Sequence, residues 1–311
     1  RLNVLQLSPP MGKRPSETDV EVGPYATQTT QPPPHWAPPL PKPWVPWLVP
    51  MIFLADVAVF AYTMYVNDCP RTTGAERCVL YSPLKRFSFQ PLKENYVLGP
   101  SASTLEKLGA LDRKLIVQNG EWWRLFSNIW LHAGVVHLAA NMLSLMMVGM
   151  RLEEEFGFWK IGLLYVVSGF GGSLMSAIYT KSSISVGASG ALLGLLGAML
   201  SELIENWTIY ANKCTTITSL VAIIALNLAV GFIPRVDSYA HTGGFLSGFL
   251  LGFVLLVRPQ YGYVSRRYIP AGYDVKHKKP KYQCYQQLLW ITALLLLVFG
   301  QSFGLGKLFK G

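Results

Sequence analysis

Charged residues are scarce in this chain. Only 14% of its 311 residues are Asp, Glu, Lys or Arg, whereas 51% are hydrophobic. An ordinary soluble domain carries about 25% charged residues, so this balance excludes a typical soluble enzyme and favours a protein embedded in lipid. The net charge of +10 is compatible with nucleic-acid binding. The basic residues gather between apolar segments, however, where membrane topology explains them, and no nucleic-acid partner is expected.

Cysteine is also scarce. The chain has four cysteines and no CxxC pair, which excludes a disulfide-built scaffold and gives no indication of a zinc site. We therefore expect no metal and no cofactor. Cys69 and Cys78 follow the first apolar segment closely. They either pair in an oxidising compartment or remain two free thiols, and the sequence leaves both alternatives open.

Long apolar segments are the dominant feature of the chain. A bilayer core of about 30 Å needs about 20 apolar helical residues to cross it. Suitable segments lie at about 44–66, 133–151, 159–178, 186–206, 214–233, 239–257 and 284–305. They predict an all-α polytopic membrane protein with seven transmembrane helices, of which six form a core at 44–257 and one lies within 284–311. The lipid bilayer is its expected environment, and the sequence does not indicate an oligomeric state.

Three polar segments separate or flank these helices. Residues 1–43 are rich in proline and lack apolar periodicity, which predicts a disordered tail. The loop 67–132 is long and rich in aromatic and basic residues, so we expect part of it to fold at the membrane surface. The connection 258–283 is strongly basic and should be cytoplasmic. Alternation then places the N-terminus in the cytoplasm and the long first loop in the lumen or outside the cell.

This orientation places four polar side chains at a similar depth. Ser189 opens the fourth span and His241 opens the sixth, while His137 and Asn141 share one face of the second span. A lone serine or histidine in a membrane helix is compatible with simple helix packing. Polar groups are costly in lipid, however, and usually face a cavity or one another. Four at one level therefore indicate a site.

Glycines accompany these side chains at helical spacing. Gly190 and Gly194 form a ridge on the fourth span, and Gly244, Gly248 and Gly252 form a matching ridge on the sixth. Such ridges let two helix backbones approach closely. A serine and a histidine on different helices need this approach to reach a hydrogen-bond distance of about 3 Å. Ordinary glycine packing is the alternative, and it would also be the means of assembling the site.

The pattern predicts a Ser–His dyad. Ser189 would attack a peptide carbonyl while His241 takes its proton as general base. The start of the helix at Ser189, with the side chains of His137 and Asn141, would stabilise the oxyanion. No acidic third member lies at this depth. Asp237 near the sixth span is the alternative third member, but we interpret it as a loop residue.

Four motifs together resemble the signature of the rhomboid intramembrane serine proteases. They are Gly187-Ala188-Ser189-Gly190, Ala240-His241-Thr242-Gly243-Gly244 with Gly248, His132-Ala133 followed by His137 and Asn141-Met142, and Trp123-Arg124 in the first loop. The six-helix core with a C-terminal seventh span is the arrangement of eukaryotic secretory-pathway members, which include plant rhomboid-like proteins.

The resemblance implies specific roles and partners. Ser189 would be the nucleophile, His241 the base, and His137, Asn141 and the Ser189 backbone N–H the oxyanion donors. A water-filled cavity would open to the lumen, the substrates would be single-span membrane proteins, and the location would be the Golgi or the plasma membrane. The chain departs from many family members at Leu193, where they carry a tyrosine stacked on the catalytic histidine.

Two other function classes are compatible with parts of the sequence. A catalytically silent relative would bind membrane clients, but such relatives usually lack the serine or the histidine. A transporter would explain the many spans and the polar Asn227 in the fifth span. The two halves of the chain show no visible repeat, which is the sequence feature that would indicate a transporter.

Several acidic residues in or near the spans need an explanation. Asp56 interrupts the first span and is expected to hydrogen-bond inside the bundle. Glu153 is interpreted as part of a solvated turn, with a structural anchor as the alternative. Glu202 and Glu205 are expected to extend to the aqueous surface, and Asn227 is expected to hydrogen-bond to another helix.

Overall fold

The computed structural model describes residues 45–180, 184–207, 213–230, 237–258 and 282–310. Within these ranges every regular element is a helix, accompanied by two isolated β-bridges. This confirms the predicted all-α class. The tail 1–43 and most of the basic loop 258–283 lie outside the described residues, and the proposed division into domains stays a prediction.

A long helical segment occupies each predicted apolar segment. They are α1 (Leu48–Asn67), α7 (Val135–Ser144) continuing through a π-helical turn (Leu145–Gly149) into α8 (Met150–Phe156), α9 (Phe158–Tyr179), α10 (Ser189–Glu205), α11 (Lys213–Val230), α12 (Ser238–Leu255) and α13 (Cys284–Lys310). Four segments are long and apolar enough to cross a membrane: Leu48–Thr72, Val135–Phe156, Phe158–Tyr179 and Cys284–Lys310. The count of seven spans stays a prediction, because α10, α11 and α12 are not among these four segments.

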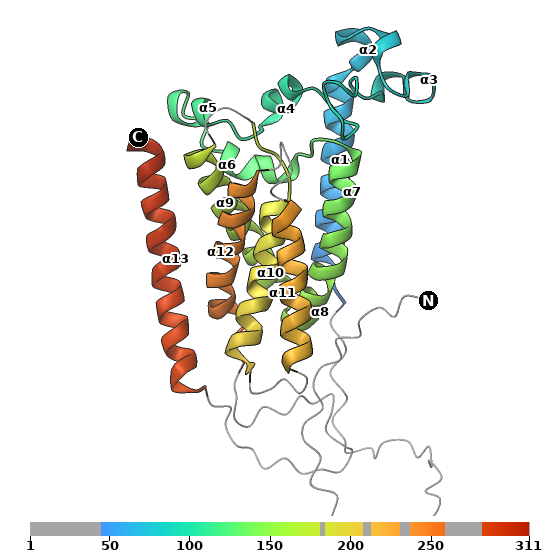
Figure 1. Ribbon diagram of the computed structural model, residues 1–311. Coiled ribbons are helices and arrows are strands. Elements are labelled where there is room, and N and C mark those ends of the chain that lie inside the picture. The colour runs from blue at the N-terminus through green and yellow to red at the C-terminus, as the bar shows by residue number, and fades with distance from the viewer. Residues whose placement is uncertain (1–44, 181–183, 208–212, 231–236, 259–281, 311) are drawn as a thin grey trace, which may run out of the picture.

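The helices form a bundle with one structured end. Helices α9, α10 and α12 pack against one another at its centre, while α1 and α7 lie on one side and α13 on the other (Figure 1). The short helices of the long loop gather at the end of the bundle where α10 and α12 begin. Residues far apart in the sequence therefore meet at this end.

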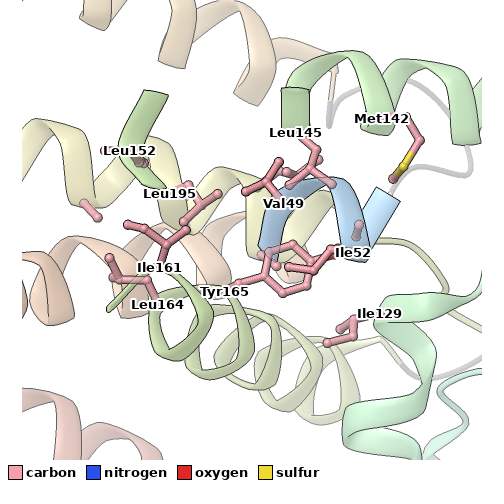
Figure 2. Packing of buried hydrophobic residues seen from close by; sticks show 14 of the residues in the cluster. Val49, Ile52, Ile129, Met142, Leu145, Leu152, Ile161, Leu164, Tyr165 and Leu195 are labelled. Carbon is pink, nitrogen blue, oxygen red and sulfur yellow. The ribbon is translucent and has the colours of Figure 1, made fainter. Parts of the chain in front are cut away.

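Buried apolar side chains hold the outer helices against this centre. Val49 and Ile52 of α1 lie beside Tyr165 of α9 and Leu145 of the π-helical turn (Figure 2). Leu195 of α10 belongs to the same cluster. In lipid, helix association depends on close van der Waals packing rather than on exclusion from water. The interdigitation of these side chains is therefore the main source of cohesion on this side.

The start of α1 is capped by a side chain from α8. The Glu153 carboxylate accepts hydrogen bonds from the backbone N–H groups of Trp47 and Leu48 at 2.9 Å and of Val49 at 2.8 Å. The first N–H groups of a helix have no partner within the helix, and the helix dipole favours a negative charge there. Glu153 is fully buried. The prediction of a solvated turn was wrong, and the alternative, a structural anchor, describes this residue.

The long first loop is folded, as its composition predicted. It contains α2 (Cys69–Thr72), η1 (Ala75–Arg77), α3 (Tyr81–Leu84), η2 (Lys85–Phe87), α4 (Ala102–Leu108), α5 (Arg113–Gln118), α6 (Arg124–Ser127) and η3 (Asn128–Trp130). Cys69 and Cys78 form a disulfide directly after α1, which decides between the two alternatives that the sequence left open.

Candidate active site

The segment that leads into α10 is held by the long loop. Ser185 and Leu111 exchange two backbone hydrogen bonds of 2.9 and 3.1 Å, and the Gly187 N–H donates to the Asn128 carbonyl at 2.9 Å. Helix α10 begins at Ser189 immediately afterwards. The hydroxyl of Ser189 therefore lies at a helix N-terminus, where backbone N–H groups without intrahelical partners gather.

Trp123 and Arg124 stabilise the part of the loop that makes these contacts. The buried Arg124 guanidinium donates to the carbonyls of Glu106 and Ala110 at 2.7 and 2.8 Å, and it pairs with Glu121 at 2.7 Å. The Trp123 ring packs so closely on Gly109 that a Cβ there would lie 2.6 Å from it. Both residues thus act on the site indirectly, through the fold of the loop.

His241 lies in the first turn of α12. The N-cap of this helix is Asp237, whose carboxylate accepts the Ala240 N–H at 3.0 Å and also accepts a hydrogen bond from the Ser176 hydroxyl of α9. The sequence interpretation of Asp237 as a loop residue is therefore incomplete, because Asp237 caps the helix that carries His241.

The structure brings Ser189 and His241 together. The Nε2 atom of His241 lies 2.9 Å from Oγ of Ser189, although the two residues are 52 positions apart. Only 5% of His241 is exposed, and its Nδ1 atom has no hydrogen-bond partner among the described residues. The arrangement is a serine–histidine pair.

Glycine backbones form the interface that allows this approach. A Cβ on Gly244 would collide with the carbonyl of Gly190, and a Cβ on Gly248 would collide with that of Gly194. The two ridges recognised in the sequence therefore face each other in direct backbone contact, as close helix packing requires. Any larger side chain at these positions would separate α10 from α12 and Ser189 from His241.

His137 and Asn141 converge on Gly187, two residues before Ser189. A Cβ built on Gly187 would lie 2.6 Å from Cε1 of His137 and 3.6 Å from Nδ2 of Asn141. Gly187 has φ +128°, a conformation that other residues rarely adopt. The Nδ2 atom of the buried Asn141 has no hydrogen-bond partner among the described residues, so this amide is available to donate to a ligand.

The hydrogen bonding of His137 indicates its tautomer. Its Nδ1 atom accepts the Ala133 N–H at 3.4 Å, so the neutral ring carries its proton on Nε2. This Nε2 atom lies on the side of Gly187, 2.9 Å from the Cβ position of that residue. The ring therefore presents an N–H donor to the same space as the Asn141 amide.

Two further residues support the donor pair. His132 is fully buried, and its ring lies 5.5 Å from that of His137 in an edge-on arrangement. Burial lowers the pKa of His132 to about 3, so the ring is neutral at physiological pH. The side chain of Asn128 accepts the Ser173 hydroxyl of α9 at 3.0 Å while its backbone holds Gly187. Sequence reasoning missed Asn128, because an asparagine in an irregular loop carries no periodic signal.

Leu193 has a different role from the tyrosine found in many relatives. It is buried in a cluster with Leu196 of α10 and with Leu220 and Ile224 of α11. Phe245, one turn after His241, packs against the same cluster. Leu193 therefore joins α10 to α11, and apolar packing around Phe245 supports the turn that follows the histidine.

Three acidic residues depart from the sequence expectations. Asp56 is fully buried without a hydrogen-bond partner among the described residues. Glu202 does not extend to the surface, because its carboxylate lies 3.2 Å from Nε of Arg258 and accepts the Asn206 amide at 3.2 Å. Glu205 is also buried. The side chain of Asn227 lies outside the described residues.

Comparisons with known proteins agree with this architecture. Residues 119–258 match the family described as the Rhomboid domain. The chain is 60% identical to RHOMBOID-like protein 5 of Arabidopsis thaliana over 303 residues, which are 96% of each chain. It is 44% identical to Inactive RHOMBOID-like protein 8 of the same plant over 214 residues, 69% of this chain and 60% of that protein.

A bacterial relative extends the comparison. The Rhomboid protease GluP of Bacillus subtilis is 37% identical over 172 residues, which cover 55% of this chain and 33% of GluP. The resemblance inferred from the serine, histidine and Trp123-Arg124 motifs is thereby confirmed. Because its helices are apolar and it matches a RHOMBOID-like protein along nearly its whole length, this chain belongs to the rhomboid family of integral membrane proteins.

Proposed function

We propose that this chain is an intramembrane serine endopeptidase that cleaves single-span membrane proteins in or near their transmembrane segment. The observation that carries the proposal is the 2.9 Å distance between Oγ of Ser189 and Nε2 of His241 at the start of two buried helices. Family membership supports the same chemistry, since one relative bears the name of a rhomboid protease.

The reaction follows from this pair. Ser189 Oγ attacks the scissile carbonyl carbon while Nε2 of His241 takes its proton. The tetrahedral intermediate collapses when the protonated His241 gives that proton to the leaving amine, and the first product departs. A water molecule then attacks the acyl-enzyme, again with His241 as base, which releases the second product as a carboxylic acid and restores the serine.

The oxyanion of both tetrahedral intermediates needs donors. Asn141 Nδ2, the Nε2–H of His137 and the backbone N–H of Ser189 are the groups on the Ser189 side of the interface that meet this need. The first turn of α10 adds its positive dipole end. A single donor in such an arrangement typically contributes about 3 to 4 kcal/mol to transition-state stabilisation.

The surroundings of the pair restrict the substrate. A peptide carbonyl in a transmembrane helix is already hydrogen-bonded within that helix, so it becomes accessible only where the helix opens. We therefore expect cleavage near a helix-weakening residue, at the membrane level where α10 and α12 begin. The disulfide Cys69–Cys78 lies in the loop at this end. Disulfides persist in oxidising compartments, which supports a luminal or extracellular site, a cytoplasmic N-terminus and a secretory-pathway membrane such as the Golgi or plasma membrane.

A catalytically silent, client-binding protein is the alternative function. The relative named inactive, which is 44% identical, supports this alternative. The protease is the preferred proposal because both Ser189 and His241 are present and within hydrogen-bond distance.

Cleavage of a single-span substrate by purified protein in proteoliposomes tests the proposal. The wild type should cut a fluorescent substrate, and Ser189→Ala and His241→Ala should each abolish cleavage. Thr242→Ala is the matched control, since Thr242 follows His241, is exposed, and its hydroxyl donates to the Ser238 carbonyl of its own helix. A fluorophosphonate probe should label the wild type and fail on Ser189→Ala.

Two results would decide against the protease. Cleavage that persists in Ser189→Ala would remove the nucleophile assignment. A wild type that neither cleaves nor takes up the probe, yet retains a substrate helix on co-purification, would favour the client-binding alternative.

A further inference from the structure

Asp237 holds the backbone of His241 as well as that of its neighbour. Its backbone carbonyl accepts the His241 N–H at 3.2 Å, and its side chain accepts the Ala240 N–H at 3.0 Å. The Ala240 N–H is one of the N-terminal donors that have no partner within the helix, whereas the His241 N–H makes the first backbone hydrogen bond of the helix. Asp237 thus holds the backbone N–H groups of Ala240 and His241, and the position of this backbone sets the position of the imidazole.

The same carboxylate joins α12 to α9. Its second oxygen accepts the hydroxyl of Ser176, which is buried one turn before the end of α9. Below this hydrogen bond, a Cβ on Gly172 of α9 would lie only 2.5 Å from the Ala240 carbonyl. The first turn of α12 therefore packs directly against the α9 backbone and is fixed to it by Asp237.

This turn also contacts the serine helix. A Cβ on Gly190, next to Ser189, would lie 3.1 Å from the Ala240 carbonyl. The Ala240 carbonyl thus lies between the backbones of α9 and α10. The backbones of α9, α10 and α12 are in direct contact here. A displacement of the first turn of α12 would therefore change the distance between His241 and Ser189.

We propose that Asp237 is a positioning residue for the reaction. It holds the first turn of α12 between α9 and α10 and so keeps the His241 imidazole within hydrogen-bond distance of Ser189. It is not the third member of a triad, because its carboxylate accepts hydrogen bonds from the Ala240 N–H and the Ser176 hydroxyl and makes none with His241 among the described residues. Nδ1 of His241 has no hydrogen-bond partner among the described residues. The proposal rests on the proposed protease function for its kinetic consequences only.

A series of substitutions separates positioning from direct catalysis. Asp237→Asn retains both hydrogen bonds, since its Oδ1 can accept the Ala240 N–H while its amide donates to Ser176. Asp237→Ala loses both. We expect kcat within about threefold of the wild type for Asp237→Asn and a fall of about 10- to 100-fold for Asp237→Ala, with KM nearly unchanged. Misplacement of a reacting group by about 1 Å can cost about 100-fold.

Ser176→Ala tests the path through α9. It should lower kcat to an intermediate level. The double variant Asp237→Ala with Ser176→Ala should be no slower than Asp237→Ala alone, because Asp237→Ala already removes the hydrogen bond to Ser176. Ser101→Ala is the matched control. It removes the side-chain cap of α4, where the Ser101 hydroxyl accepts the Thr104 N–H, and should leave kcat unchanged.

Amide hydrogen exchange of the full chain in detergent gives a readout that does not depend on activity. Asp237→Ala should accelerate exchange at residue 240, whose N–H loses its side-chain acceptor, and Asp237→Asn should not. If the wild type shows no protease activity but the two variants show this difference in exchange, the protease proposal is refuted. The role of Asp237 in holding the first turn of α12 is then still supported.

Three outcomes would overturn the positioning role. One is unchanged exchange and unchanged kcat per labelled serine in Asp237→Ala. Another is a loss in Asp237→Asn as large as in Asp237→Ala, which would indicate an acidic catalytic role. The third is a loss in Asp237→Ala that disappears when the rate is divided by the amount of folded protein.

Discussion

Gly248 of α12 and Gly194 of α10 lie with their backbones in direct contact, one to two turns along their helices from His241 and Ser189, whose Nε2 and Oγ atoms approach to 2.9 Å. The serine and the histidine can meet only because neither glycine carries a side chain. The stability of this interface and the geometry of the pair are therefore coupled.

Gly248→Ala should destabilise the protein and slow cleavage together. Its methyl group would overlap the carbonyl and Cα of Gly194, and overpacking of this kind costs about 1 to 3 kcal/mol. Thermal unfolding in detergent and the cleavage rate measure the two effects. Gly300→Ala is the control, because a Cβ there meets nothing within 4 Å. Equal melting temperatures for the two variants would contradict the packing seen here.

Gly187→Ala should reduce activity more than stability. The new methyl group would lie 2.6 Å from Cε1 of His137 and would occupy the space where we place the oxyanion. We expect a fall in kcat of at least about 100-fold, comparable to the loss of one oxyanion donor. Gly120→Ala is the control for backbone strain alone, since Gly120 also has positive φ, +71°, but has no neighbour within 4 Å of its Cβ position. Similar kinetics for the two variants would refute the steric explanation.

Asn141→Ala should lower kcat by about 100- to 1,000-fold while KM changes little, because its amide would act on the transition state rather than on the bound substrate. The residual activity should exceed that of Ser189→Ala or His241→Ala. Steady-state kinetics on a fluorescent single-span substrate measure this difference. Wild-type kcat in Asn141→Ala would exclude the amide as a donor.

Glu153→Ala should destabilise the first helix. Three backbone N–H groups at the start of α1 would lose their acceptor, and hydrogen bonds to a charged group contribute about 1.5 to 3 kcal/mol each. We expect a loss of at least about 2 kcal/mol, seen as a lower melting temperature. The neighbouring Glu154→Ala provides the control, since Glu154 is exposed. A melting temperature unchanged by Glu153→Ala would show that water replaces the carboxylate.

The disulfide between Cys69 and Cys78 should be present in the mature protein. Alkylation of the denatured, unreduced chain should modify two cysteines, Cys214 and Cys284, and prior reduction should raise the number to four. Replacing both Cys69 and Cys78 with Ser should lower stability by about 2 to 3 kcal/mol through the added freedom of the unfolded loop. Four reactive thiols without reduction would place this loop in a reducing compartment.

Much of the site could be predicted from the sequence because its signals are local. The spacing of Gly190 and Gly194 on one helix and of Gly244 and Gly248 on another follows helical periodicity. The depth of Ser189 and His241 follows from the length of each apolar segment relative to the bilayer. The structure faces these ridges against each other and brings the two side chains within hydrogen-bond distance.

Other features could not be predicted because they depend on partners remote in sequence. The local sequence predicts that Glu153 is solvated, whereas in the structure α1 begins at its carboxylate. Glu202 is expected from the sequence to reach the surface, but Arg258, located after α12, supplies a counter-charge to its buried carboxylate. Neither partner can be inferred from the local composition around these glutamates.

The sequence by itself determined the all-helical membrane class, the family resemblance and the residues of the serine–histidine pair, because hydropathy, segment length and glycine spacing are properties of contiguous residues. Only the tertiary structure decided that Gly187 faces His137 and Asn141, that Leu193 packs toward α11, and that Asp237 joins the histidine helix to α9. These relationships depend on where helices cross. The crossing points are set by the summed packing of side chains from the whole bundle, which no single segment of the sequence encodes.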